Sequence, residues 1–282
     1  MTYRDVLLAL TAYPEPTPAA AADDAVAFAA AIGAKISALA CEIRIQMPGT
    51  AFGTALMNVP AMAAAEGRKS ADNAEKVLTA FQAAAERQGV YQEKITDRCA
   101  ISAVGGVMTE YARLRDLTIV PITQSEPISQ DYAQAIIFGS GRPVLVTPAP
   151  RKTTEPLKLE TAVIAWDFSR PAARAVADAL PLLEKTKQVF VVTVANEKAI
   201  ATDRSGAELA KHLARHGVNV VLETVDAGPH GIGDVLESYV KSHNADLLVM
   251  GAFGHSRLRD FILGGATQSI LAQPLVPTLL SH

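Results

Sequence analysis

Two pairs of glycines in one segment are the residues in this chain most suited to ligand chemistry. The segment, GAFGHSRLRDFILGGATQSIL, begins at residue 251 and ends at residue 271. Its glycines and the cationic side chains between them are Gly251, Gly254, Gly264 and Gly265, with His255, Arg257 and Arg259. Glycine lets a ligand approach the main chain closely, and exposed main-chain amides bind anions. A phosphate loop is one interpretation, and a strand end followed by a helix cap explains the same spacing.

The flanking elements predict that both glycine pairs lie at one edge of a sheet. The apolar run DLLVM ends at Met250 and is typical of a buried strand, and ATQSILAQ after Gly265 has a helical pattern. Ligands of open α/β sheets bind outside the carboxyl ends of the strands, and a helix N-terminus attracts anions. We therefore expect a polyphosphate pocket, with His255 and the arginines either as countercharge or as solvated side chains. The patterns GxxxxGK[ST] and GxGxxG are missing, so neither a P-loop nor a Rossmann fingerprint is predicted.

Apolar runs alternate with helical patterns twice along the chain. The first series predicts strands at 5–10, 35–43, 91–99, 116–122 and 142–148, with helices at 19–31, 70–88 and 102–115. The second predicts strands at 161–166, 188–195, 218–225, 245–251 and 275–280, with helices at 171–183, 205–216 and 232–242. The Pro-rich, charged stretch 149–158 is typical of a linker. We predict an α/β protein of two tandem domains, 1–150 and 151–282, each with a five-stranded parallel sheet.

The composition excludes several classes of function. Apolar residues make up 49% of the 282 residues and charged residues 20%, which is enough for a packed core. A net charge of −3 and 5% aromatic residues argue against a nucleic-acid or anionic-membrane partner. The amino terminus lacks the pattern of a signal peptide, and no apolar run is long enough to span a membrane. We expect a cytoplasmic protein.

The cysteines and histidines give weaker indications. Two cysteines are too few for a disulfide framework, and neither has metal-type spacing. Cys41 fits a buried strand, whereas Cys99 at a strand end is a small core residue or a redox-active thiol. His230, in the glycine-rich loop DAGPHGIGD, lies either beside His255 at one pocket or free in a solvated loop. A metal site from His230, His255 and Asp167 is only a conjecture, and we predict no metal ligands and no catalytic residues.

The spacing Gly251-x2-Gly254-x9-Gly264 resembles the ATP-binding motif of the universal stress protein family. The stretch AVIAWDFSRPAARAV resembles the first strand and helix of that family as well. The resemblance covers residues 161–282 and, more weakly, 3–148. It implies the adenine-nucleotide alpha-hydrolase fold, here as two tandem domains packed as a pseudo-dimer through their last strands, 142–148 and 275–280. A homodimer of the chain is a further possibility.

The resemblance also implies which residues hold ATP, with Mg²⁺. Asp167 would meet the adenine with Ala165 and Trp166 beside it, Val194 would hold the base through its main chain, and Met250 precedes the phosphate loop. The ribose and phosphates would contact Gly251, Gly254, His255, Gly264, Gly265, Ala266 and Thr267. A carboxylate can accept a hydrogen bond from the exocyclic amine of adenine. The alternative for Asp167 is a helix N-cap, a role that Ser169 could also fill.

One position departs from the family pattern. The family usually has Ser or Thr after the last glycine of the motif, and this chain has Gly265. Thr267 could supply a substitute hydroxyl. One lost neutral hydrogen bond costs about 0.5–1.5 kcal/mol, so we expect weaker binding rather than none.

The first half has lost the corresponding residues. Thr11 stands where the second half has Asp167, and Pro121 and Gln124 stand where it has Gly251 and Gly254. Pro121 removes an amide donor, and Glu126 and Asp131 bring negative charge to the same place. We expect a degenerate first domain with a structural role.

These observations lead to a nucleotide-binding stress-response regulator or sensor, at most a weak ATPase. The alternative is a scaffold or small-ligand carrier of the same fold that binds no nucleotide. An ATP pyrophosphatase of the wider fold class is disfavoured, because the WDFSRP turn lacks the glycines of an early phosphate loop.

Overall fold

The computed structural model of the chain describes residues 2–45, 59–123, 127–149, 158–195, 205–252 and 265–282. The elements of the first half are β1 (Asp5–Leu10), α1 (Ala19–Ile32), β2 (Lys35–Ile43), α2 (Val59–Arg87), β3 (Tyr91–Cys99), the 3-10 turn η1 (Ile101–Ala103), α3 (Val104–Arg113), β4 (Leu117–Thr123), α4 (Ile128–Gly139) and β5 (Val144–Ala149). Those of the second half are β6 (Thr161–Ala165), α5 (Arg170–Leu183), β7 (Gln188–Ala195), α6 (Ser205–Arg215), β8 (Val220–Asp226), α7 (Ile232–Ser242), β9 (Leu247–Gly251), α8 (Gly265–Ala272) and β10 (Thr278–Ser281).

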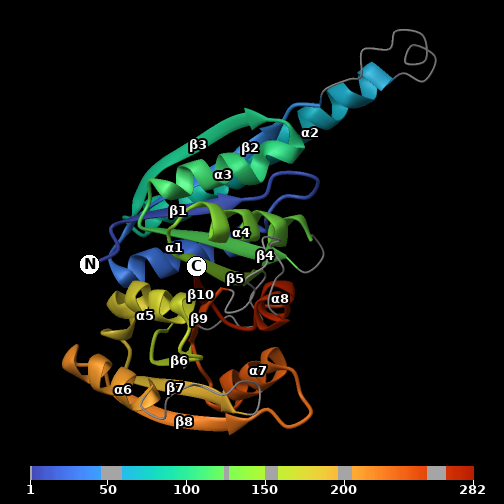
Figure 1. Cartoon of the computed structure of the whole chain (residues 1–282). Coiled ribbons are helices and arrows are strands. Elements are labelled where there is room, and N and C mark those ends of the chain that lie inside the picture. The colour runs from blue at the N-terminus through green and yellow to red at the C-terminus, as the bar shows by residue number, and fades with distance from the viewer. Residues whose placement is uncertain (1, 46–58, 124–126, 150–157, 196–204, 253–264) are drawn as a thin grey trace.

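The described strands form one continuous sheet through both halves of the chain (Figure 1). Its order is β3-β2-β1-β4-β5-β10-β9-β6-β7-β8. Counted outward from the junction of β5 and β10, the strands of each half follow the same order: fifth, fourth, first, second, third. All neighbours are parallel except β5 and β10, which pair antiparallel with Leu145 opposite Leu279. The prediction of two five-stranded parallel sheets, paired through their last strands, is confirmed.

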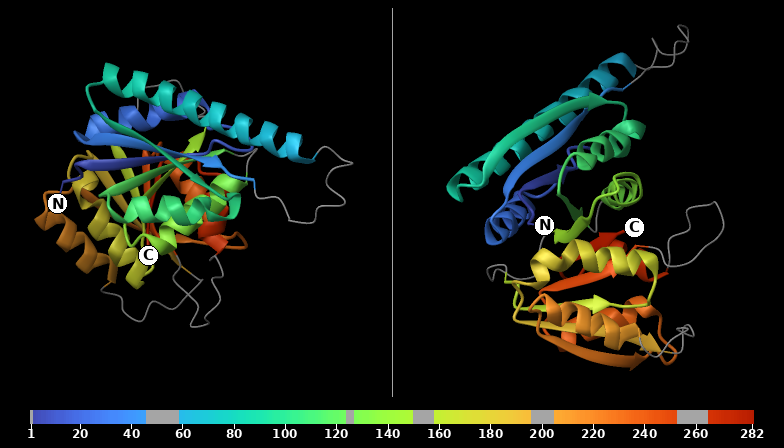
Figure 2. Two further views of the ribbon diagram at one scale, coloured as in Figure 1. Left: turned by 90° about the horizontal axis from the view of Figure 1, so that it is seen from above. Right: turned by 60° about the vertical axis from the view of Figure 1, so that its left-hand side comes forward.

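Helices cover both faces of this sheet (Figure 2). Side chains of α1, α2, α5 and α6 share one apolar core, and those of α3, α4, α7 and α8 share the other. Alternate residues of a buried strand serve the two cores: Leu8 and Leu10 of β1 face the first, whereas Leu7 and Ala9 face the second. Continuous apolar runs are therefore required in the central strands, because both faces are buried.

The similarity between the two halves extends to individual hydrogen bonds. Oδ2 of Asp116 accepts the amides of Arg4 and Asp5 at 2.9 and 3.1 Å, where β1 begins. Oδ2 of Asp246 accepts the amides of residues 160 and 161, both at 2.9 Å, where β6 begins. In each half an aspartate just before the fourth strand thus satisfies main-chain donors that lie before the sheet ladder starts.

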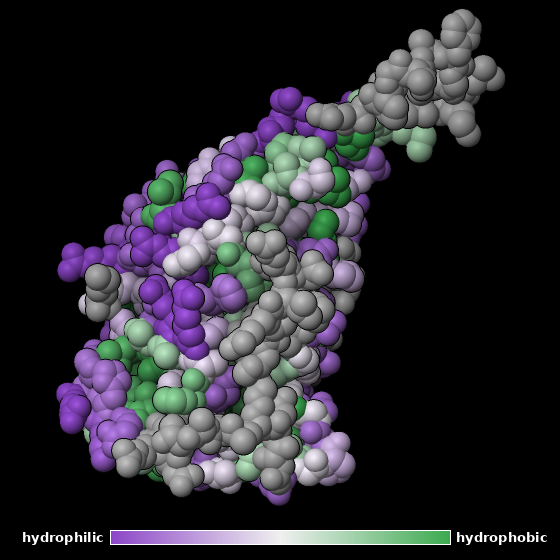
Figure 3. All heavy atoms as spheres, viewed as in Figure 1, coloured by the Kyte–Doolittle hydropathy of each residue, from purple (hydrophilic) through white to green (hydrophobic). Residues whose placement is uncertain are grey.

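Two helices differ from the sequence-based prediction. Helix α2 begins at Val59 rather than Ser70, because the alanine-rich stretch after Pro60 favours a helix that starts with proline in its first turn. This end projects from the body of the protein, with Met62 63% exposed, and Figure 3 shows apolar residues on it. Helix α4 was not predicted, although Tyr132, Ala133, Ile136 and Ile137 have the spacing of a helix face.

The halves also meet through polar contacts beside the paired strands. The hydroxyl of Tyr3 donates to the main-chain oxygen of Asp178 in α5. Nζ of Lys185 donates to the main-chain oxygen of Ile32 at 2.9 Å, where it satisfies a carbonyl at the end of α1. No helix in the described ranges has the length and hydrophobicity needed to cross a bilayer.

Candidate functional site

The candidate site lies where the chain leaves β6 and β9. These strands are parallel neighbours, with Ala165 opposite Met250 at their carboxyl ends. After β6 the chain passes to α5 on one face of the sheet, and after β9 it passes to α8 on the other. Such a divergence is the topological switch point at which open α/β sheets bind ligands.

The turn after β6 is fixed by two side-chain hydrogen bonds. Oγ of Ser169 accepts the amide of Ala172 at 3.2 Å and caps α5. Oδ1 of Asp167 accepts the amide of Ser169 at 3.0 Å. The N-cap is therefore Ser169, whereas Asp167 stabilises the turn before it with its side chain exposed at the sheet edge.

Two aromatic residues flank Asp167 and differ in exposure. Trp166 is 8% exposed and belongs to the core that includes α5. Phe168 is 54% exposed, and its ring lies edge-on to Trp166 with centroids 6.1 Å apart. Its φ of 60° is uncommon for a bulky residue. Sequence reasoning did not single out Phe168, because no periodicity indicates a left-handed residue at a strand end.

In the structure, the glycine at position 251 has a steric explanation. A Cβ at this position would lie 2.4 Å from the nitrogen of Ala172 and 2.6 Å from the carbonyl carbon of Pro171. The first turn of α5 thus fills the side of Gly251 on which a Cβ would lie. Glycine is required here because β9 and α5 pack backbone to backbone.

The first turn of α8 forms the opposite side of the site. Gly265 is exposed, and no atom of the described residues lies within 4 Å of a Cβ built on it. Ala266 is half-buried. Thr267 was expected to replace the hydroxyl that the family usually has at position 265, but its side chain is only 3% exposed and is covered by protein. Gly233 of α7 lies close to Ser269, which fixes α8 against its neighbour.

The remaining candidates are divided between this edge and undescribed segments. Val194 is half-buried near the end of β7, opposite Val225 of β8, and Met250 is 5% exposed within β9. His230 is exposed in the turn before α7. Gly254, His255 and Gly264, together with Arg257 and Arg259, lie outside the described residues. Within the described part of the chain, no three His, Cys, Asp or Glu side chains converge as metal ligands.

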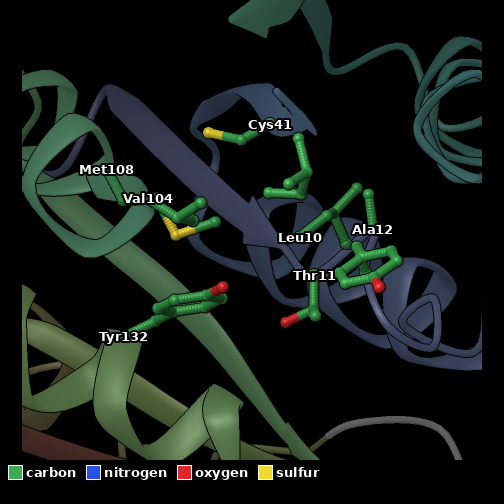
Figure 4. Close-up of a pocket in the computed structure, with 9 residues that line it drawn as sticks. Leu10, Thr11, Ala12, Cys41, Val104, Met108 and Tyr132 are labelled. Carbon is green, nitrogen blue, oxygen red and sulfur yellow. The ribbon is translucent and has the colours of Figure 1, made fainter. Parts of the chain in front are cut away.

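The corresponding crevice of the first half is filled with side chains (Figure 4). Thr11 occupies the place of Asp167, and Val104, Met108 and Tyr132 point into the space beside it. No part of the space left between these side chains is wide enough for a water molecule. A nucleotide is far larger than a water molecule, so it does not fit this crevice with the side chains in these positions.

Comparison with known proteins agrees with this architecture. Residues 158–282 match the model of the universal stress protein family. A search of curated proteins gave no match. A solved universal stress protein from Archaeoglobus fulgidus DSM 4304 is 15% identical with a TM-score of 0.68, over 98% of this chain and 95% of that one. A putative universal stress protein from Pseudomonas aeruginosa UCBPP-PA14 is 14% identical with a TM-score of 0.56, over 99% and 93%.

A solved universal stress protein in complex with cAMP is 17% identical with a TM-score of 0.35, over 44% of this chain and 97% of that one. At 14–15% identity, the Archaeoglobus and Pseudomonas structures show the fold alone, and the family model shows the family of residues 158–282. The carboxy-terminal half of the chain, residues 158–282, therefore belongs to the universal stress protein family, and the whole chain has the fold of the Archaeoglobus and Pseudomonas proteins.

Proposed function

We propose that the second domain, residues 151–282, binds an adenine nucleotide, ATP with Mg²⁺, at the carboxyl edge of β6 and β9. The protein would act in the cytoplasm as a stress-response regulator or sensor. The observation that carries the proposal is the exposed carboxylate of Asp167 at the switch point, held by its bond to the Ser169 amide. Because Ser169 already caps α5, Asp167 is not needed for that role.

The proposed assignment gives each group one task. Asp167 accepts the exocyclic amine of adenine, with Ala165 and Trp166 beside it, and the main chain of Val194 holds the other edge of the base. The phosphates lie toward the glycine segment, where the first amides of α8 and its positive dipole end favour an anion. Gly254, His255 and Gly264 complete this side in the proposal.

At most slow hydrolysis is proposed. The phosphate side relies on main-chain amides, which stabilise negative charge but cannot accept a proton from an attacking water, and His255 is proposed there only as countercharge. A phosphate site built from main-chain amides suits a protein that binds a nucleotide without hydrolysing it rapidly. The first domain, residues 1–150, would keep the fold and pair with the second domain without binding a nucleotide, since its crevice is filled.

Calorimetric titration of the full-length protein with Mg-ATP tests this proposal. Asp167→Ala removes a hydrogen bond to a charged group, worth about 1.5–3 kcal/mol, so affinity should fall by roughly ten- to a hundred-fold. Gly254→Asp places a carboxylate beside the phosphates and should abolish binding. Asp72→Ala, an exposed carboxylate on α2 of the first domain, is the matched control and should leave affinity unchanged.

Near-zero heats for wild type and all variants would contradict the nucleotide proposal. They would favour a scaffold or small-ligand carrier, for which the packing of α5 into the space beside Gly251 is the supporting observation. Binding that survives in both Asp167→Ala and Gly254→Asp would place the nucleotide elsewhere on the protein.

A further inference from the structure

The fold brings together the two cysteines of the chain. Cys41 lies in β2 and Cys99 at the end of β3, neighbouring parallel strands of the first half. The register places Cys41 opposite Asp97 and Ile43 opposite Cys99. Because side chains alternate along a strand, both thiols lie on the same face of the sheet, one diagonal step apart. Both contact the same apolar core.

The two thiols interact and are not equivalent. Cys41 is 3% exposed, whereas Cys99 is half-buried. Burial raises the pKa of both thiols, but a hydrogen bond from the Cys41 thiol acts to lower the pKa of Cys99. Cys99 therefore ionises more readily and is the more accessible of the two, which makes it the sulfur that reacts first with a solvent oxidant.

The position of β3 allows the sulfurs to approach each other. A disulfide requires a sulfur–sulfur distance of about 2.05 Å, so the two strands must adjust. Strand β3 is an edge strand of the sheet and pairs with β2 alone. Its pairing with β2 already contains a register shift, between Ile36 and Ala38. An edge strand held on one side can shift without disrupting a second ladder of hydrogen bonds.

We propose that Cys41 and Cys99 are a redox modification site, which closes to an intramolecular disulfide when a peroxide oxidises the protein. The Cys99 thiolate attacks one peroxide oxygen, the O–O bond breaks, and a sulfenic acid forms with release of hydroxide, which takes up a proton as water. The Cys41 sulfur then attacks the Cys99 sulfur and expels the second oxygen as water. Two thiols and one hydrogen peroxide thus give one disulfide and two waters, and a dithiol reductant restores both thiols.

Closure of this bond would alter the first-domain crevice. Cys41 lines that crevice beside Met108 and Tyr132 (Figure 4). A bond to Cys99 would draw the Cys41 sulfur toward β3 and link β2 covalently to the edge strand. Oxidation would therefore change the first half of the chain, at a site separate from the nucleotide edge of the second half.

The test uses the full-length reduced protein treated with hydrogen peroxide, blocked with iodoacetamide in denaturant and digested with trypsin. The expected product is a cross-link between tryptic peptides 36–44 and 99–113, with an intact mass lower by about 2 Da and no free thiol. Dithiothreitol should restore two thiols. Cys41→Ser should leave Cys99 oxidised to sulfenic or sulfinic acid, whereas Cys99→Ser should leave Cys41 reduced because it is buried.

Three results would overturn the proposal: two free thiols after treatment, oxygen added to Cys99 of the wild type without a cross-link, or a cross-link only between separate chains. The wild-type measurement decides the matter even if a variant folds poorly. The cross-link is measured without nucleotide. Failure of ATP binding in the calorimetric titration would therefore leave this result unchanged, and the two proposals can fail separately.

Discussion

Substitution of Gly251 by alanine separates the two possible reasons for a glycine at the end of β9. The added methyl would lie 2.4 Å from the nitrogen of Ala172, 2.6 Å from the carbonyl carbon of Pro171 and 2.8 Å from its Cβ. These atoms belong to the first turn of α5, which Ser169 caps. The backbone of Gly251 is not among the described left-handed glycines, so the cost of alanine is steric.

The magnitude follows from what must move. Overpacking a tight contact costs about 1–3 kcal/mol, and here the obstructing atoms are main-chain atoms that cannot rotate away. We therefore expect the upper end, about 3 kcal/mol of unfolding free energy. A shift of the first turn also weakens the Ser169 cap, whose complete loss would add about 0.5–2 kcal/mol. For a domain of this size, about 3 kcal/mol corresponds to a decrease in Tm of roughly 6–12 °C.

Thermal unfolding without nucleotide measures this cost, and tryptophan fluorescence is a suitable signal. Trp166 is the only tryptophan of the chain, is buried, and precedes the turn into α5. The control is Gly265→Ala, because within the described part of the chain no atom lies within 4 Å of a Cβ at Gly265. Its expected effect is within about 0.5 kcal/mol of wild type, as for an unconstrained surface position.

A Tm of Gly251→Ala within about 1 °C of wild type would refute this explanation. It would mean that α5 does not pack against the end of β9 as described. Loss of nucleotide binding at unchanged stability would then return Gly251 to the role expected from the sequence, a close approach of ligand to main chain.

Two further predictions concern side chains that accept main-chain amides. Ser169→Ala should lower the unfolding free energy by about 0.5–2 kcal/mol in urea denaturation, and Ser169→Asp, which also caps a helix, should restore most of it; equal stability of all three proteins would contradict the N-cap assignment. Asp116→Ala and Asp246→Ala each remove the acceptor of two amides and should each cost about 1–3 kcal/mol. Because these aspartates lie in different halves, the loss of unfolding free energy in the double variant should equal the sum of the two single losses within about 0.5 kcal/mol. A markedly larger loss would mean that the two aspartates are energetically coupled.

The elements predicted most accurately are those whose local pattern leaves one solution. The strands at 5–10, 35–43, 91–99 and 188–195 and the helix at 232–242 have the predicted bounds. Three of these strands, 5–10, 35–43 and 188–195, are nearly continuous apolar runs, and the helix has a clear apolar face. Helix α2 was predicted too short because its first turns make few core contacts, so the helical propensity of alanine decides its start. Helix α4 was missed although its apolar spacing was present.

The sequence by itself determined the α/β class, the pattern repeated in two halves and the glycine segment as the candidate phosphate side. It left Asp167 and Ser169 as competing N-caps, took Gly251 for a ligand contact and left the role of Cys99 open. The structure shows Ser169 as the N-cap of α5, the first turn of α5 packed against Gly251, and both cysteines on one face of the sheet. The last two depend on contacts between elements distant in the chain. Gly251 meets α5 across many residues of sequence, and Cys41 meets Cys99 only because β2 and β3 pair in one register. Local propensity carries no information about such contacts, since packing between elements sets them.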